Sequence, residues 1–174
     1  MFRKLLYPNL YVGSVHHIDI DSLAVMGIRG LLFDLDNTVV PRDVDDFSAE
    51  IKDWFGRLEA RGFKMCFVSN NGPRRLQNLT GALGLPFVCR AVKPRKKPFL
   101  KAMETIGTSQ KETAVIGDQI FTDILGGNRL GLFTILVTPM PGKEYWATEL
   151  INRRLERFII KRLKRNPPAG CGEV

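Results

Sequence analysis

The sequence contains five short apolar runs, and each is followed by a polar or glycine-containing turn and a segment with helical periodicity. The runs are continuously apolar and do not alternate with polar residues, which is typical of strands that are covered on both faces. This order predicts a doubly wound α/β domain, in which a five-stranded parallel sheet carries helices on both faces. The expected strands are Gly30–Leu35, Phe63–Ser69, Phe87–Ala91, Thr113–Gly117 and Phe133–Thr138, and the expected helices are Phe47–Ala60, Pro73–Leu83, Pro98–Ile106 and Ile120–Leu130.

Composition limits the class of protein. The 174 residues are 44% hydrophobic and 25% charged, which excludes a disordered or collagen-like chain and suits one globular domain. The apolar uncharged run Leu130–Gly142 contains two prolines and, like every other uncharged run in the sequence, is shorter than the roughly 20 residues that a membrane-spanning helix needs. The three cysteines lack metal-binding spacing and indicate free thiols in a reducing compartment, so we expect a cytoplasmic protein.

Polar side chains follow four of the five expected strands. In a doubly wound sheet, ligands bind beyond the carboxyl ends of the strands, so these side chains are expected to share one site. The residues that follow the first four strands are, in order, Asp34 and Asp36; Ser69 and Asn70; Lys93; and Asp118, with Asp123 five positions later.

Three carboxylates at one edge of a sheet repel one another unless a cation joins them, and hard oxygen ligands suit Mg²⁺. Asp34 offers one oxygen to a metal and one for nucleophilic attack, which is an established route for phosphoryl transfer. Asp36 lies two residues further on, on the same side of an extended strand, where it is suited to acid–base work. Ser69 and Lys93 are suited to holding phosphoryl oxygens. This combination predicts phosphoryl-transfer chemistry.

Four motifs carry a family resemblance: DLDNT (Asp34–Thr38), SNN (Ser69–Asn71), KP (Lys93–Pro94) and GDQIFTD (Gly117–Asp123). In this order they resemble the haloacid dehalogenase (HAD) superfamily of phosphatases, from about Gly27 to Pro139. The resemblance implies a Rossmann-like fold and an aspartyl-phosphate mechanism. It further implies these roles: Asp34 is the nucleophile, Asp36 is the general acid/base, Ser69, Asn70 and Lys93 bind phosphate, and Asp34, the backbone carbonyl of Asp36, Asp118 and Asp123 hold Mg²⁺. Lys97–Pro98 repeats the Lys-Pro pair, so Lys97 is the alternative phosphate lysine.

The sequence segments around these motifs resemble one branch of the superfamily. The segments PNLYVGSV, GIRGLLFDLDNTVV and GDQIFTDILGGNRLGLFTILV are similar to the YqeG-type subclass IIIA phosphatases. That branch resembles the mitochondrial phosphatidylglycerophosphate phosphatase, which implies that the substrate is phosphatidylglycerophosphate and the product phosphatidylglycerol. The alternative within the same chemistry is a nucleotide, sugar or protein phosphate, because shared motifs report the reaction and not the leaving group.

Two further features bear on the partner. The stretches Val39–Phe63 and Ser69–Lys93 are too short to contain a cap domain, so residues 1–142 are expected to form a capless phosphatase domain. An open site of this kind suits a bulky or membrane-borne phosphomonoester. The alternative is that oligomerisation supplies a lid. Residues 143–165 have eight basic and three acidic side chains with an apolar face, which predicts a basic amphipathic helix. This helix would dock on the domain, lie on an anionic membrane surface at the inner face, or do both, and 166–174 would form a flexible tail.

Two other classes of protein fit the sequence less well. A receiver domain carries its phospho-acceptor on the third strand, and the third strand here ends at Arg90 with no aspartate. A nucleic-acid-binding module would use the net charge of +8, which is concentrated in residues 90–101 and 143–165. No aromatic-studded sheet or recognition motif accompanies that charge, so no nucleic-acid partner is expected.

Overall fold

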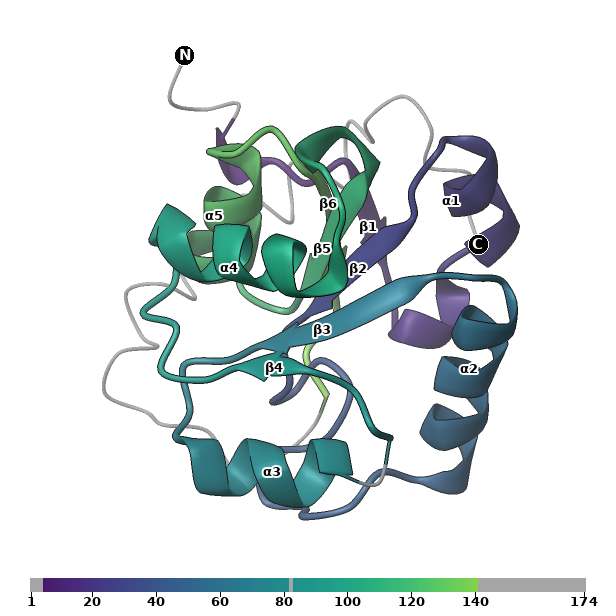
Figure 1. The fold of residues 1–174 in the computed structure, drawn as a ribbon, viewed down its shortest axis with the longest axis vertical. Coiled ribbons are helices and arrows are strands. Elements are labelled where there is room, and N and C mark those ends of the chain that lie inside the picture. Colours follow the sequence, from purple (N-terminus) through teal and green to yellow (C-terminus); the bar gives the residue numbers. More distant parts are fainter. Residues whose placement is uncertain (1–4, 82, 141–174) are drawn as a thin grey trace.

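The computed structural model describes residues 5–81 and 83–140 (Figure 1). The predicted basic helix 143–165 and the tail 166–174 lie outside the described residues. In the described part of the chain, no helix is both long enough and apolar enough to cross a membrane.

A six-stranded sheet forms the centre of the molecule, with the strand order β1-β6-β5-β2-β3-β4 and every pair parallel. The predicted parallel α/β architecture is confirmed, and the structure adds a sixth strand at one edge. That strand, β1, is only three residues long and half-buried, so it lacks the buried apolar run that marks the four central strands. The strands are β1 Leu10–Val12, β2 Gly30–Phe33, β3 Lys64–Val68, β4 Phe87–Val88, β5 Thr113–Gly117 and β6 Phe133–Val137.

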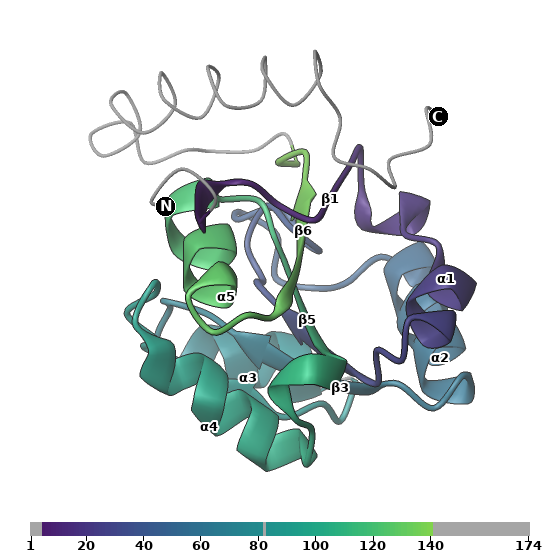
Figure 2. The same ribbon diagram turned by 90° about the horizontal axis from the view of Figure 1, so that it is seen from above.

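Helices cover both faces of the sheet, as predicted (Figures 1 and 2). Successive residues of a strand point to opposite faces, so Leu31 and Phe33 of β2 pack with α1, α2 and α3, while Leu32 packs with α4. The described helices are η2 Val15–His17, α1 Ile20–Val25, α2 Ala49–Ala60, α3 Pro73–Gly81, α4 Lys96–Ile106, η3 Gln110–Glu112, η4 Ile120–Ile124 and α5 Leu125–Asn128.

One of these helices differs in form from the expectation. Ile120–Leu130 was expected as a single helix, but the structure has the π-helical turn η4 followed by the short helix α5. Helix α1 was not predicted at all, and the side chain of Asp19 begins it by accepting hydrogen bonds from the backbone N–H groups of Asp21 and Ser22.

The connections at the carboxyl ends of the central strands are short. Residues 34–48 join β2 to α2, and the described part of the connection between β3 and β4 contains α3 as its one helix. Neither connection contains an inserted domain in the described residues. The carboxyl ends of β2, β3, β4 and β5 are therefore not covered by a cap within this part of the chain.

Candidate active site

Three buried aspartates meet at the carboxyl edge of the sheet. Asp34 follows β2, Asp118 follows β5, and Asp123 lies in η4. One carboxylate oxygen of each residue lies within 4.8 Å of one from each of the other two. The pairing of β2 with β5 produces this juxtaposition, because the backbone N–H of Asp34 donates to the carbonyl of Ile116 over 2.9 Å. The fold thus brings Asp34 together with Asp118 and Asp123, which lie 84 or more positions later in the sequence.

Gly117 makes room for the third carboxylate. A Cβ atom at this position would lie 2.4 Å from the carboxyl carbon of Asp123, well inside van der Waals contact. The absence of a side chain at the end of β5 therefore allows η4 to bring Asp123 back over the strand.

Lys93 is the buried cation of the site. Its Nζ lies 2.5 Å from Oδ1 of Asp34 and 2.6 Å from Oδ1 of Asp123, and its side chain is 3% exposed. Lys97 is exposed on α4, so the structure places the first of the two candidate lysines against the carboxylates. One ammonium against three carboxylates leaves the cluster with an excess of negative charge.

Burial and this excess charge shift the pKa values in the cluster. Desolvation raises the pKa of Asp34 to about 6, although the neighbouring ammonium of Lys93 opposes the shift. Desolvation, together with repulsion from Asp34 and Asp123, raises the pKa of Asp118 well above its usual range. Desolvation would lower the pKa of Lys93, but attraction to Asp123 and Asp34 outweighs it and the pKa is raised. The cluster therefore favours a further positive charge.

A divalent cation with a preference for oxygen ligands fits this cluster. The three aspartates supply anionic oxygen donors from separate elements, and no sulfur or imidazole ligand accompanies them in the described triad. Such a donor set suits Mg²⁺ rather than zinc or copper. The hydroxyl of Thr38 donates to Oδ1 of Asp118 over 3.4 Å and helps to orient this carboxylate.

The side chain of Asp36 is not one of the three clustered carboxylates and contacts Arg75 and Asn71. The Nε and Nη2 atoms of Arg75 each lie 2.9 Å from Oδ1 of Asp36, and the side-chain amide of Asn71 donates to Oδ2. Arg75 also reaches Oδ1 of Asp45 over 2.7 Å and the carbonyl oxygens of Pro41 and Val44. The guanidinium thus fixes both Asp36 and the loop that follows β2.

Arg75 was not identified from the sequence. A signal was present, because Arg75 falls on the first turn of the helix that follows the SNN motif. The start of this helix at Pro73 was expected, but the direction in which it turns Arg75 towards Asp36 depends on tertiary packing.

Ser69 and Asn70 differ in their placement. Ser69 is buried at the end of β3, and its hydroxyl oxygen accepts a hydrogen bond from the backbone N–H of Asn71 over 3.2 Å. Asn70 is exposed, and its side-chain oxygen accepts from the backbone N–H of Lys93 over 2.9 Å. In this structure, the side chain of Asn70 therefore ties the segment that carries Lys93 to the end of β3.

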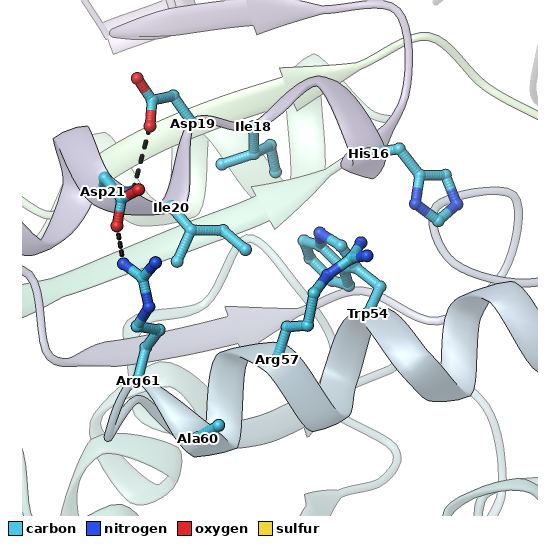
Figure 3. Close-up of a pocket in the computed structure, with 9 residues that line it drawn as sticks. All are labelled: His16, Ile18, Asp19, Ile20, Asp21, Trp54, Arg57, Ala60 and Arg61. Carbon is cyan, nitrogen blue, oxygen red and sulfur yellow. Dashed lines mark hydrogen bonds and ion pairs between the residues drawn. The ribbon is translucent and has the colours of Figure 1, made fainter.

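A separate pocket of about 440 Å³ lies between α1 and α2, remote from these residues in the fold (Figure 3). It contains none of the residues expected at the site, and its Arg61 is paired with Asp21. This pocket is therefore distinct from the carboxylate cluster. It is lined by His16, Ile18, Asp19, Ile20, Asp21, Trp54, Arg57, Ala60 and Arg61.

Comparison with known proteins agrees with this geometry. A family model described as HAD-hydrolase-like matches residues 91–143. The chain is 38% identical over 165 residues to the protein named "Probable phosphatase YqeG" of Bacillus subtilis, and the match covers 95% of each chain. It is 28% identical over 174 residues to phosphatidylglycerophosphate phosphatase 1, chloroplastic, of Chlamydomonas reinhardtii, with 92% of this chain and 63% of that protein covered.

Among solved structures, the magnesium-bound HAD-hydrolase YfnB of Bacillus subtilis has a TM-score of 0.53 at 16% identity, and the match covers 72% of this chain and 99% of that one. At this identity the likeness shows a common fold alone. The relationship to YqeG is stronger, because it extends along nearly the whole of both chains. On that evidence the chain belongs to the haloacid dehalogenase superfamily, as a phosphatase related to YqeG.

Proposed function

We propose that the protein is a Mg²⁺-dependent phosphomonoesterase that works through an aspartyl-phosphate and hydrolyses phosphatidylglycerophosphate to phosphatidylglycerol. The chemistry is supported by one observation above all, the contact of the Asp34 carboxylate with both the buried acidic cluster and Lys93. The choice of substrate is supported by the match of 92% of this chain to a phosphatidylglycerophosphate phosphatase.

Asp34, the backbone carbonyl of Asp36, Asp118 and Asp123 would hold the metal. When bound, Mg²⁺ offsets the negative charge of the carboxylates and of the phosphoryl oxygens and so allows an anionic substrate to approach an anionic nucleophile. Lys93 and Ser69 complete the phosphate site, because both are buried at the same edge and carry hydrogen-bond donors.

The reaction proceeds in two steps. First, a carboxylate oxygen of Asp34 attacks phosphorus and the bond from phosphorus to the leaving oxygen breaks, while the Asp36 carboxyl group gives its proton to that oxygen and an alcohol departs. Second, water attacks the phosphorus of the aspartyl-phosphate, Asp36 takes a proton from the water, and the bond from phosphorus to the Asp34 oxygen breaks. Inorganic phosphate leaves, and both aspartates return to their starting states.

Arg75 and Asn71 support the role of Asp36. An acid–base group must be held in one orientation, and the two side chains together engage both carboxylate oxygens of Asp36. Asp34, in contrast, has a carboxylate oxygen within 4.8 Å of oxygens of Asp118 and Asp123, and its Oδ1 contacts Nζ of Lys93. The two aspartates of the DLDNT motif thus stand in different surroundings, which suits different tasks.

The short connections around the site suit a large substrate. A lipid phosphate carries two acyl chains that cannot enter a closed chamber, and the loops of residues 34–48 and 69–72 leave the strand ends without an inserted domain in the described residues. We expect the acyl chains to remain in the bilayer while the headgroup phosphate reaches Asp34. This places the enzyme at a membrane surface during turnover, in agreement with a peripheral protein of the cytoplasmic side.

The test is phosphate release from phosphatidylglycerophosphate in mixed micelles, with Mg²⁺ or with EDTA, and with the Asp34→Asn variant as the inactive control. We expect release with Mg²⁺, none with EDTA and none from the variant. A parallel panel of soluble nucleotide, sugar and protein phosphates tests the substrate. Higher kcat/KM on one of these would reassign the substrate and keep the chemistry, whereas release by the Asp34→Asn variant would overturn the mechanism.

A further inference from the structure

The segment that follows β4 alternates between buried and exposed residues beside the active site. Ala91 and Lys93 are buried, whereas Arg90 is exposed and Val92 is 54% exposed. Hydrogen bonds hold the backbone in place: the N–H of Arg90 donates to the carbonyl of Asn71 over 2.8 Å, and that of Ala91 donates to the carbonyl of Ser69 over 3.0 Å. With Lys93 anchored to Asn70, the apolar side chain of Val92 is fixed in an outward position next to the catalytic lysine.

The backbone of this segment is unusual. Arg90 has φ 47° and Val92 has φ 52°, so two residues with Cβ atoms adopt the left-handed conformation. This conformation is unfavourable, above all for a β-branched residue such as valine, and glycine or asparagine would serve it better. Residues that are retained in such a conformation are found disproportionately at functional sites.

Positive charge extends from this segment into α4. Arg95, Lys96 and Lys97 are exposed at the start of α4, whose first turn contains no acidic residue. The positive end of the helix dipole repels cations at this place. Among the described residues, no ion pair involves Arg90 or these three. Neither helix stability nor a neighbouring carboxylate therefore accounts for the four charges.

We propose that Arg90, Val92, Arg95, Lys96 and Lys97, which we call the cationic rim, form the surface on which an anionic lipid bilayer docks. The proposal rests on the proposed function, because a lipid phosphate can reach Asp34 only if this edge of the sheet meets the membrane. The four cations attract anionic headgroups, and Val92 is positioned to enter the apolar boundary beneath them. Lys93, in the same segment as the rim residues, contacts Asp34 of the carboxylate cluster.

Vesicle flotation of the full chain tests the rim directly. The rim variant is Arg95→Glu with Lys96→Glu, and the matched control is Lys64→Glu with Lys111→Glu, which makes the same change in charge at the amino ends of β3 and β5. Residues 143–165 are identical in all proteins, so any binding by that segment cancels. With phosphatidylcholine vesicles that contain phosphatidylglycerol, we expect the rim variant to bind at least about tenfold more weakly than the wild type, and the control to bind nearly as well.

Two further measurements distinguish a loss of membrane binding from a loss of activity or stability. Turnover of soluble p-nitrophenyl phosphate should be unchanged in the rim variant, because neither substituted residue contacts the carboxylate cluster, and its melting temperature should not fall, because acids replace cations at a helix N-terminus. A second variant, Val92→Glu, should also weaken vesicle binding without loss of p-nitrophenyl phosphate turnover.

Several results would overturn the proposal: equal vesicle binding by the wild type and the rim variant, equal losses in the rim variant and the matched control, or no vesicle binding by the wild type. Loss of single-stranded RNA binding in the rim variant, with vesicle binding retained, would assign the rim to nucleic acid instead. Failure of the proposed function is separately visible: the wild type would then not hydrolyse phosphatidylglycerophosphate in micelles, while the flotation result would still decide the role of the rim.

Discussion

The two aspartates of the DLDNT motif are only two residues apart, yet they lie in different electrostatic surroundings. Asp34 shares a buried cluster in which three carboxylates face the single ammonium of Lys93. Asp36 is half-buried and contacts the amide of Asn71 and the guanidinium of Arg75, which also pairs with the exposed Asp45. The Asp34 cluster therefore needs a further cation to balance its charge, whereas the side chain of Asp36 is held in place by Arg75 and Asn71.

This difference agrees with the division of labour proposed for the two residues. A nucleophile must be ionised and must accept an approaching phosphoryl group, and a metal ion supplies the charge for both. A proton donor and acceptor must instead hold a fixed orientation while its protonation state changes. The four predictions that follow test this contrast.

The largest effect is expected from loss of the nucleophile. Asp34→Asn should lower kcat by about 10⁴-fold or more, because the covalent step loses its attacking oxygen. Asp36→Asn should lower kcat on an alkyl phosphate by on the order of 10²–10⁴-fold, and by less on p-nitrophenyl phosphate, whose leaving group departs without a proton. The measurement is steady-state turnover of both substrates. A smaller loss in Asp34→Asn than in Asp36→Asn would reverse the assignment.

Arg75 should come next. Arg75→Ala leaves Asp36 without its guanidinium partner and should lower kcat by about 10- to 100-fold on alkyl phosphates, with a smaller change on p-nitrophenyl phosphate. Arg75→Lys should restore activity only in part, because an ammonium cannot reproduce the fork that reaches Asp36 and Asp45.

Arg74 offers the control for this prediction. It precedes Arg75 on α3 and is exposed, and Arg74→Ala should leave kcat unchanged. Equal losses from Arg74→Ala and Arg75→Ala, or equal losses on the two kinds of substrate, would show that Arg75 does not act through Asp36.

Magnesium should stabilise the Asp34 environment. At a concentration about 100 times its Kd, a ligand that binds only the folded state contributes about 2.7 kcal/mol, which corresponds to about 5–10 °C in Tm for a chain of this size. Asp118→Asn relieves part of the repulsion among the buried carboxylates and should raise the Tm of the metal-free protein, while it removes most of the shift on addition of Mg²⁺. Thermal unfolding with Mg²⁺ and with EDTA measures both effects. A full Mg²⁺ shift in Asp118→Asn would place the metal elsewhere.

The smallest effect is expected at Asn70. Asn70→Ala removes the acceptor for the backbone N–H of Lys93 and should cost on the order of 1 kcal/mol of stability, with a rise of a few-fold in KM through a less fixed Lys93. Kinetics and thermal unfolding of the same variant measure these values. A loss of kcat as large as that of Arg75→Ala would indicate direct contact between Asn70 and the phosphoryl group.

The sequence was informative where a feature depends on local pattern. Continuous apolar runs predicted the five longer or more buried strands, and the rule that ligands gather at their carboxyl ends predicted the meeting of Asp34, Asp118 and Asp123. β1 could not be predicted in this way, because its three residues are all only half-buried and do not form a buried apolar run.

Features that depend on tertiary contacts could not be predicted from the local sequence pattern. Arg75 meets Asp36 across 39 positions, and Asn70 meets the backbone of Lys93 across 23. The expected strand Phe87–Ala91 ends at Val88 in the structure, because the chain turns at Arg90 and again at Val92 in left-handed conformations. Local propensity disfavours such conformations for arginine and valine, so a reading of local preferences does not find them.

The most direct test of the central claim is the location of the phosphoryl group during turnover. The enzyme is mixed with substrate and Mg²⁺, quenched in acid within one turnover and digested, and the phosphorylated peptide is identified by mass spectrometry. The account predicts one phosphoryl group on Asp34, and none when EDTA is added before mixing. A phosphoryl group on Asp36 or Asp118, or transfer to water with no phosphorylated residue at any time, would contradict it.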